Sequence, residues 1–215
     1  MIKRAYYILR KVVASPREKG EVSSGLWPDK IRKKVFKMCR LEEGRLLEVG
    51  CGEGLFLERI KDVSNLKVFG IDHWDEILKR ANRRLERIGN VNLLQAKGDI
   101  LPFKDSSFDT VVCINVILNL PSENYCLKLL KEISRVCKWG GKIIFEIRNS
   151  LNPIIYFAYK LAKFYDTTNP PLTSYRIVEM LEILKQARLE VIEKVPIGFP
   201  LNSLAPIIIF KVAKE

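Results

Sequence analysis

The sequence predicts an α/β protein in which a mostly parallel, seven-stranded sheet carries helices on both faces and ends in an antiparallel strand pair. From residue 45 onward, short β-rich apolar runs alternate with helical patterns. Apolar strands separated by helices are typical of a parallel sheet that is covered on both faces. The predicted parallel strands are residues 45–50, 66–72, 91–96, 108–116 and 142–148. Two more runs, 191–197 and 206–212, are joined by a short connection through Gly198 and Pro200, which favours antiparallel pairing.

Helical patterns fill the intervals between the strands, and two more precede them. The predicted helices within the sheet region cover residues 55–61, 75–88, 122–137 and 175–187. Near the start, apolar residues recur at three- and four-residue spacing over residues 2–13. A second helix begins at Pro28, a favourable first-turn residue, and ends before Gly44. An aromatic segment, 151–165, precedes a proline-rich break at 169–171.

Length and composition limit the class of protein. A chain of 215 residues suits one domain of ordinary size. Its 47% apolar and 29% charged residues exclude a disordered chain and a membrane bundle. Charged residues interrupt the apolar start, which argues against a signal peptide, and no uncharged stretch reaches the ~20 residues of a membrane-spanning helix. We therefore expect a soluble, cytoplasmic protein without a transmembrane segment.

The cysteines and the single histidine, His73, do not form a metal-binding pattern. The five cysteines lie far apart, and none forms a CxxC pair. Zinc and iron–sulfur sites need clustered thiolates or imidazoles, so the sequence predicts no metal site. Scattered cysteines inside apolar runs are typical of buried residues in a reducing cytosol.

Positive charge is concentrated at the front of the chain. The formal net charge is +12, of which residues 1–45 carry +8 and the remaining 170 residues +4. Such a front suits phosphate, anionic lipid or an acidic substrate, and equally a solvated helix face of a Lys/Glu-rich, thermophilic protein. We interpret residues 1–40 as a basic helical cover, residues 41–215 as the main domain, and residues 149–172 within it as a substrate-side lid.

A glycine-rich turn follows the first strand and is the strongest sequence signal for a ligand. The segment reads Leu-Leu-Glu-Val-Gly-Cys-Gly-Glu-Gly from residue 46 to residue 54. Glycines let the backbone turn sharply and approach a ligand, and the helix expected next offers free N–H groups there. A dinucleotide turn needs GxGxxG, but Leu55 occupies the position of its third glycine. The pattern is GxGxG preceded by the acid Glu48, which indicates a different cofactor.

Over about residues 41–148 the chain resembles the class I S-adenosylmethionine-dependent methyltransferases, in particular the ubiquinone-biosynthesis-like group. Four segments match that family in the expected order. They are the glycine turn, a second strand ending in an acid at 68–72, an adenine-binding turn and fourth strand at 98–109, and the turn at 135–141 before the fifth strand. The resemblance implies a Rossmann-like fold, methyl transfer, and S-adenosylmethionine as cofactor.

The resemblance also implies roles for the matching residues. Asp72 would accept both ribose hydroxyls, a bidentate contact that suits a carboxylate. Asp99 would accept from the adenine amino group, and the Ile100 N–H would donate to a ring nitrogen. The carboxylate before the glycines would face the cofactor's cationic amino group through water, the Asn115 backbone would hold that ammonium, and His73 would pack on adenine or ribose. The implied cofactor-binding set is Glu48, Gly50, Cys51, Gly52, Gly54, Asp72, His73, Asp99, Ile100 and Asn115.

The acceptor pocket is expected at the carboxyl ends of the fourth and fifth strands. Its candidate residues are Asn119, Arg148, Asn149, Tyr156, Tyr159 and Tyr165, with Tyr6, Tyr7 and Trp27 from the front. Many members of the resembled group carry a histidine near position 119, where this chain has Asn119. The nature of the acceptor and the presence of a general base therefore stay open, and segment 151–165 is interpreted either as a lid or as a core helix.

Three functional readings follow. The first is a methyltransferase that acts on a small or medium-sized metabolite by in-line displacement, with no covalent enzyme intermediate. The second is an RNA methyltransferase whose basic front contacts phosphates, which is not favoured because no Asn/Asp-Pro-Pro-Tyr signature follows the fourth strand. The third is a non-catalytic S-adenosylmethionine-binding or membrane-surface protein that uses its amphipathic front. No pattern in the sequence predicts an oligomeric state.

Overall fold

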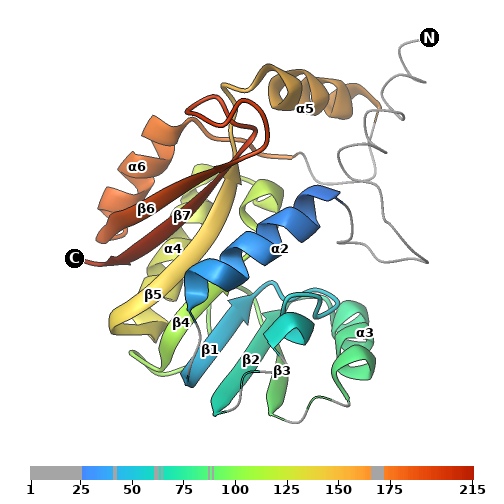
Figure 1. Ribbon diagram of the computed structural model, residues 1–215, viewed down its shortest axis with the longest axis vertical. Coiled ribbons are helices and arrows are strands. Elements are labelled where there is room, and N and C mark those ends of the chain that lie inside the picture. Colours follow the sequence, from blue (N-terminus) through green and yellow to red (C-terminus); the bar gives the residue numbers. More distant parts are fainter. Residues whose placement is uncertain are drawn as a thin grey trace.

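The sheet has the predicted architecture (Figure 1). The computed structural model describes residues 26–40, 43–60, 63, 65–86, 88, 90–165 and 172–215, with only the backbone of residues 26 and 161–165. The strands are β1 (Gly44–Val49), β2 (Leu66–Asp72), β3 (Val91–Gln95), β4 (Phe108–Cys113), β5 (Cys137–Arg148), β6 (Leu189–Ile197) and β7 (Ile207–Lys214). Their order is β3-β2-β1-β4-β5-β7-β6, with β1 to β5 parallel, β7 antiparallel to β5, and β6 antiparallel to β7.

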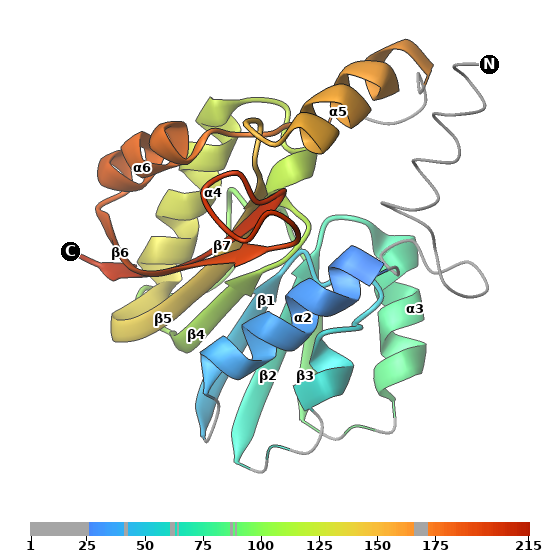
Figure 2. The same ribbon diagram turned by 45° about the horizontal axis from the view of Figure 1, so that its top comes forward.

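Helices cover both faces of this sheet (Figure 2). One layer contains α2 (Leu26–Cys39), the short 3₁₀ helix η1 (Leu57–Ile60) and α3 (Asp75–Leu85), and the other contains α4 (Glu123–Val136) and α6 (Ile177–Gln186). The helix α5 (Pro153–Tyr165) follows β5 directly and lies beyond the carboxyl ends of the parallel strands (Figure 1). Within the described part of the chain, no helix is both long enough and apolar enough to cross a membrane.

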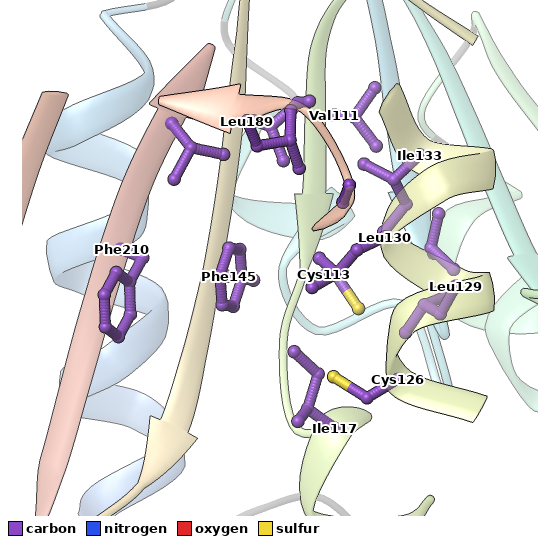
Figure 3. Close-up of a cluster of buried hydrophobic side chains, with 14 of the residues drawn as sticks. Val111, Cys113, Ile117, Cys126, Leu129, Leu130, Ile133, Phe145, Leu189 and Phe210 are labelled. Carbon is purple, nitrogen blue, oxygen red and sulfur yellow. The ribbon is translucent and has the colours of Figure 1, made fainter. Parts of the chain in front are cut away.

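The apolar stripe of α4 explains why this helix packs on the sheet. Cys126, Leu129, Leu130 and Ile133 recur at the helical spacing and are fully buried. Figure 3 shows them directed at side chains of β4, β5 and β7, where Phe145 and Phe210 stack with ring centroids 5.4 Å apart. This packing fixes β4 and the segment after it, which form part of the site described below.

The helix α2 is part of the packed layer. Ile31, Val35 and Cys39 are fully buried in the same cluster as β1 and β7 residues. Residues 26–39 therefore contribute to the core of the sheet domain. The predicted helix at 2–13 and the candidates Tyr6 and Tyr7 lie outside the described residues, so a separate basic cover stays a proposal for residues 1–25.

One predicted helix is wrong in type. Residues 55–61 were expected to form an α-helix that presents its positive end to the glycine turn, but only the four-residue 3₁₀ helix η1 is present in the described residues there. Its buried residues, Leu57 and Ile60, are three apart, a spacing that places both on one face of a 3₁₀ turn. In the described residues, the glycine turn is therefore not followed directly by the N-terminus of an α-helix. The predicted fifth strand also begins earlier, at Cys137, because Cys137 already pairs with Phe108 across a bulge.

Candidate cofactor site

The glycine turn has a backbone that only glycine adopts easily. Gly50, Gly52 and Gly54 all have positive φ values, of 74°, 51° and 77°. The N–H groups of Gly50 and Cys51 both donate to the carbonyl of Ile71 over 2.8 Å. A Cβ atom at Gly50 would lie 2.2 Å from Cγ2 of Val116. The turn is therefore tied to the end of β2 and fits tightly against the segment after β4.

Asp72 connects the glycine turn to the start of α3. Its Oδ2 accepts from the Gly52 N–H over 3.0 Å, and its Oδ1 accepts from the Trp74 N–H over 3.1 Å. The His73 ring lies beside the same carboxylate, with Nδ1 3.4 Å from Oδ1. Each oxygen of a carboxylate can accept a second hydrogen bond. Asp72 is thus fixed by the backbone and keeps one acceptor position on each oxygen for a ligand.

These elements enclose a cavity of about 500 Å³ at the carboxyl edge of the sheet, a size within the usual range for small-molecule sites. Most of the predicted cofactor residues line it. The predicted lining residues that the structure brings together are Glu48, Gly50, Cys51, Gly52, Asp72, His73, Asp99 and Asn115, together with the acceptor candidate Asn119. Burial raises the pKa of the Cys51 thiol, so this residue is neutral at physiological pH.

Glu48 and Arg32 bring two ionisable side chains to the cavity lining. Glu48 is buried, and burial raises the pKa of its carboxyl well above the usual range; the nearby Arg32 opposes this shift and Asp72 adds to it. Its Oε2 accepts no hydrogen bond from the described residues. Arg32 comes from α2 and also lines the cavity. A buried carboxylate oxygen of this kind suits a cationic group of a ligand.

The segment after β4 is held by buried polar residues of β5. Asn115 has a left-handed backbone, with φ of 58°. Its N–H donates to Oε1 of Glu146 over 2.8 Å, and its Oδ1 accepts from Nη2 of Arg148 over 2.7 Å. The Asn119 amide donates to the Asn115 carbonyl over 2.9 Å. The cavity wall at Asn115 is therefore determined by side chains that do not themselves line the cavity.

Two predicted cofactor residues, Ile100 and Gly54, lie outside the cavity lining. The Ile100 N–H donates to the Lys97 carbonyl over 3.2 Å, and its side chain is 72% exposed, so neither group lines the cavity. Local turn formation uses the donor that was assigned to adenine. Gly54 is also not part of the cavity lining: a Cβ there would lie 2.8 Å from Leu85, so its role is packing against α3. Asp99 does line the cavity, beside Lys97 and Gly98.

The predicted acceptor residues after β5 do not reach the cavity lining. Asn149 is fully buried, and its amide donates to the carbonyls of Ser203 and Ala205, which makes it a structural residue. Arg148 pairs with Glu146 over 3.3 Å. Tyr156 and Tyr159 lie on α5 outside the cavity lining, and burial raises the pKa of the Tyr159 hydroxyl, which lies near Arg148. The side chain of Tyr165 is outside the described residues, and Trp27 packs over Gly198.

The sequence interpretation missed residues that reach the site from elsewhere. Arg32 was counted only as part of a basic helix, and Glu146 only as part of a strand. Neither lies in a motif, although a single acid within an apolar strand is a signal that could have identified Glu146. Tyr125, Leu120 and Leu129 complete the wall after β4. Within the described residues, no group of three or more His, Cys, Asp or Glu side chains could hold a metal ion.

Comparison with known proteins identifies the class. The family described as "Methyltransferase domain" matches residues 47–145, which span the glycine turn, Asp72, Asp99 and Asn115. The chain belongs to the class I S-adenosylmethionine-dependent methyltransferases. A phosphatidylethanolamine N-methyltransferase of Cereibacter sphaeroides is 29% identical to this methyltransferase over 183 residues, 83% of this chain and 86% of the relative.

One further relative agrees with this class, and one solved structure agrees with the fold. A demethylmenaquinone methyltransferase of Staphylococcus saprophyticus is 31% identical over 60% of this chain, which spans 56% of that relative. The solved structure of a Pyrococcus horikoshii protein has the same fold, with a TM-score of 0.74, 16% identity and 99% coverage of both chains. The methyltransferase is an enzyme whose cofactor is S-adenosylmethionine.

The cavity of this methyltransferase fits that cofactor. S-Adenosylmethionine carries an ammonium, a ribose diol and an adenine. The buried Oε2 of Glu48 suits the ammonium, and the free acceptor positions of Asp72 suit the diol. Asp99 lies on the same cavity lining, where it can accept from an amino group. Gly50 and Gly52 line the cavity without side chains, which allows a ligand to approach the backbone of the turn closely.

Proposed function

We propose that this methyltransferase transfers the methyl group by in-line displacement to a small or medium-sized acceptor that has an apolar part. The proposal rests on the way charged and apolar residues are distributed over the cavity lining. The charged residues belong to the half assigned to the cofactor, whereas the wall after β4 consists mainly of Val116, Leu120 and Leu129. Asn119 and Tyr125 are the polar side chains of this wall beyond Asn115. Such a wall suits an apolar acceptor with a nucleophile that reacts without a strong general base.

The cofactor supplies an electrophilic methyl group with its own leaving group. The protein then has to align the acceptor, and holding two reactants in line can contribute roughly 7–11 kcal/mol to lowering the barrier. Asp72 and the glycine turn would fix the cofactor. Asn115 is held by Glu146, and the wall that starts there would orient the acceptor. Asn119 and the Tyr125 hydroxyl could accept or donate a hydrogen bond at the acceptor's polar group.

The names of the relatives support an acceptor with an apolar part. One relative is named for phosphatidylethanolamine and another for demethylmenaquinone. The first substrate presents an amine and the second a quinone ring, so the reacting groups differ. Both molecules carry long hydrocarbon chains. A lipophilic acceptor is therefore the feature that the two relatives have in common, and we extend it to this chain.

An acceptor screen tests the proposal. The full chain is incubated with methyl-labelled S-adenosylmethionine and four acceptor sets: lipid amines, prenylated quinols, their short-chain water-soluble analogues, and RNA. We expect label in a lipophilic acceptor or its short-chain analogue, and none with the Asp72→Ala variant. Label in RNA alone would overturn the proposal in favour of the basic front acting on nucleic acid. A fifth set contains strongly polar metabolites, and label in that set alone would also contradict the proposal.

A further inference from the structure

An apolar surface lies at the carboxyl edge of the sheet, outside the cavity. It consists of exposed side chains from the start of α5 and from the loop between β6 and β7. Phe199 is 85% exposed, Leu201 72% and Phe157 61%. The full set, called the edge surface below, is Leu151, Ile154, Tyr156, Phe157, Phe199, Leu201 and Leu204. Exposed apolar groups that gather in this way mark interaction sites.

Hydrogen bonds hold the two parts of the edge surface together. The Asn149 amide donates to the Ser203 carbonyl over 2.7 Å and to the Ala205 carbonyl over 2.9 Å. The Asn152 amide, at the start of α5, donates to the Leu204 carbonyl over 2.9 Å. Both views show α5 and the β6–β7 loop at the same end of the molecule (Figures 1 and 2). These hydrogen bonds therefore hold the two parts of the edge surface together as a single surface.

The edge surface is next to the cavity wall. After α5 the chain returns at Thr173, whose N–H donates to the Leu118 carbonyl over 2.7 Å and whose hydroxyl donates to the Leu120 carbonyl over 2.7 Å. Leu120 lines the cavity. The segment that follows α5 is therefore tied to the wall after β4.

The charges of the edge surface indicate what kind of partner binds there. Segments 149–165 and 198–206 contain no acidic residue, and the only charged residues in them are Lys160 and Lys163. The Lys160 Nζ lies 5.7 Å from the ring centroid of Tyr156, a residue of the edge surface. A surface of apolar side chains with lysines and without acids is complementary to an anionic lipid layer.

The chain outside the described residues strengthens this complementarity. Residues 1–25 carry six Lys/Arg against two Asp/Glu. They join α2 next to the β6–β7 loop, because a Cβ at Gly198 would lie 2.2 Å from the Trp27 ring. A basic segment is thus attached at the same end of the molecule as the edge surface.

We propose that the edge surface docks on an anionic lipid bilayer, with its apolar side chains in the interface and its lysines at the headgroups. Docking would place the cavity wall at the membrane surface, where a lipophilic acceptor is concentrated. This use of docking in catalysis rests on the proposed function, whereas the docking itself can be measured without cofactor or acceptor.

Vesicle flotation with the full chain tests the proposal. The vesicles are phosphatidylglycerol–phosphatidylcholine mixtures or phosphatidylcholine alone. We expect tighter binding to the anionic vesicles, which weakens when salt is raised. The double variant F199S/L201S, and independently F157S, should bind at least tenfold more weakly. The control W139S removes an equally exposed side chain at the start of β5, at the opposite end of the sheet, and should bind as the wild type does.

Hydrogen exchange separates the possible occupants of the edge surface. Vesicles should protect residues 153–160 and 198–204. Protection of residues 1–25 alone, or equal binding by F199S/L201S and W139S, would overturn the proposal in favour of a basic arm. A wild-type dimer that F199S/L201S converts to a monomer would overturn it in favour of self-association. Methylation of a short-chain acceptor without vesicle binding refutes docking only, and vesicle binding without any lipophilic acceptor refutes the proposed function only.

Discussion

The Asn115 N–H donates to Oε1 of Glu146 over 2.8 Å, which joins the segment after β4 to the neighbouring strand β5. Asn115 lines the cavity with a left-handed backbone, and Glu146 is fully enclosed behind it. Arg148 completes the arrangement, because it contacts both Glu146 and the Asn115 side chain. Glu146 and Arg148 are therefore positioning residues for the cavity wall.

Glu146 gives the protein a defined pH dependence. Burial raises the pKa of its carboxyl from an ordinary 4.5 to about 7, although Arg148 opposes the shift. A raised folded-state pKa means that the folded protein holds the proton more tightly, so the stabilisation is present below pH 4.5 and is lost as the pH rises through about 7. At about 1.4 kcal/mol per pKa unit, the free energy of unfolding should lose about 3 kcal/mol from this group.

The Glu146→Gln variant should lack this loss when urea unfolding is measured between pH 4.5 and pH 7.5. The Glu132→Gln variant is a control, because the pKa of Glu132 is shifted in the opposite direction. Arg135 holds the pKa of Glu132 below its ordinary value, so that stabilisation is present above pH 4.5 and is lost as the pH falls below it; this control is therefore measured below pH 4.5. Parallel pH profiles for the wild type and Glu146→Gln would contradict the assignment.

Asp72 should matter far more for cofactor affinity than His73. Asp72→Ala removes two prospective hydroxyl contacts and also the acceptor of the Gly52 N–H. Losing charge-assisted hydrogen bonds costs about 1.5–3 kcal/mol each, so we expect affinity to fall ten- to a hundredfold or more. His73→Ala, whose ring is mostly exposed, should change affinity less than threefold. Calorimetric titration of both variants checks this, and equal small effects would mean that the ribose lies elsewhere.

A side chain at Gly50 would meet both backbone strain and lack of space, whereas a side chain at Gly140 would meet only the backbone strain. Both have nearly the same φ, 74° and 73°, but a Cβ at Gly140 has no neighbour within 4 Å. Gly140→Ala should therefore cost about 1–2 kcal/mol from the left-handed backbone alone. Gly50→Ala should cost about 1–3 kcal/mol more through the contact with Val116, and should weaken cofactor binding. Urea unfolding gives both energies; identical values for the two variants would show that the turn can shift freely.

Arg32 should stabilise the buried carboxylate of Glu48. Arg32→Met removes the positive charge that opposes the raised pKa of Glu48, and leaving a buried carboxylate without its compensating charge costs about 3–5 kcal/mol. The double variant Arg32→Met with Glu48→Gln should regain much of this loss, because no buried charge then remains at these two positions. A double-mutant cycle on unfolding free energies measures the coupling. Additive effects of the two substitutions would show that the two charges act independently.

Residues 1–26 should act as a cover over the acceptor side of the cofactor. A chain that starts at Trp27 keeps the buried stripe of α2, so it should stay folded and bind S-adenosylmethionine within about tenfold of the full chain. It should lose methyl transfer to a short-chain acceptor. If transfer to that acceptor is retained and only lipid binding falls, the segment is an anchoring arm. Unfolding of the truncated chain would contradict both roles.

The sequence by itself determined the sheet, the cofactor class and nine of the residues that line the cavity. These features are local: a strand–glycine–acid pattern needs only the residues within it, and Gly50, Gly52 and Gly54 have the backbone that their residue type favours. The resemblance to the methyltransferase family implied that Asp72 and Asp99 belong to one site, and the alternation of strands and helices agrees with it because the carboxyl ends of parallel strands share an edge.

The tertiary structure alone decided what lies behind and beside that site. Arg32 lines the same cavity as Glu48 only because α2 packs on the sheet in one cluster with β1 and β7 residues, and Glu146 reaches Asn115 only because β4 pairs with β5 in a particular register. The same packing turned Asn149 into a support for the β6–β7 loop and left Phe157 and Phe199 exposed on one surface. Hydrophobic periodicity indicates which face of an element is buried, but it does not specify the partner against which that face packs. The polar residues that depend on the partner can therefore be assigned only from the folded chain.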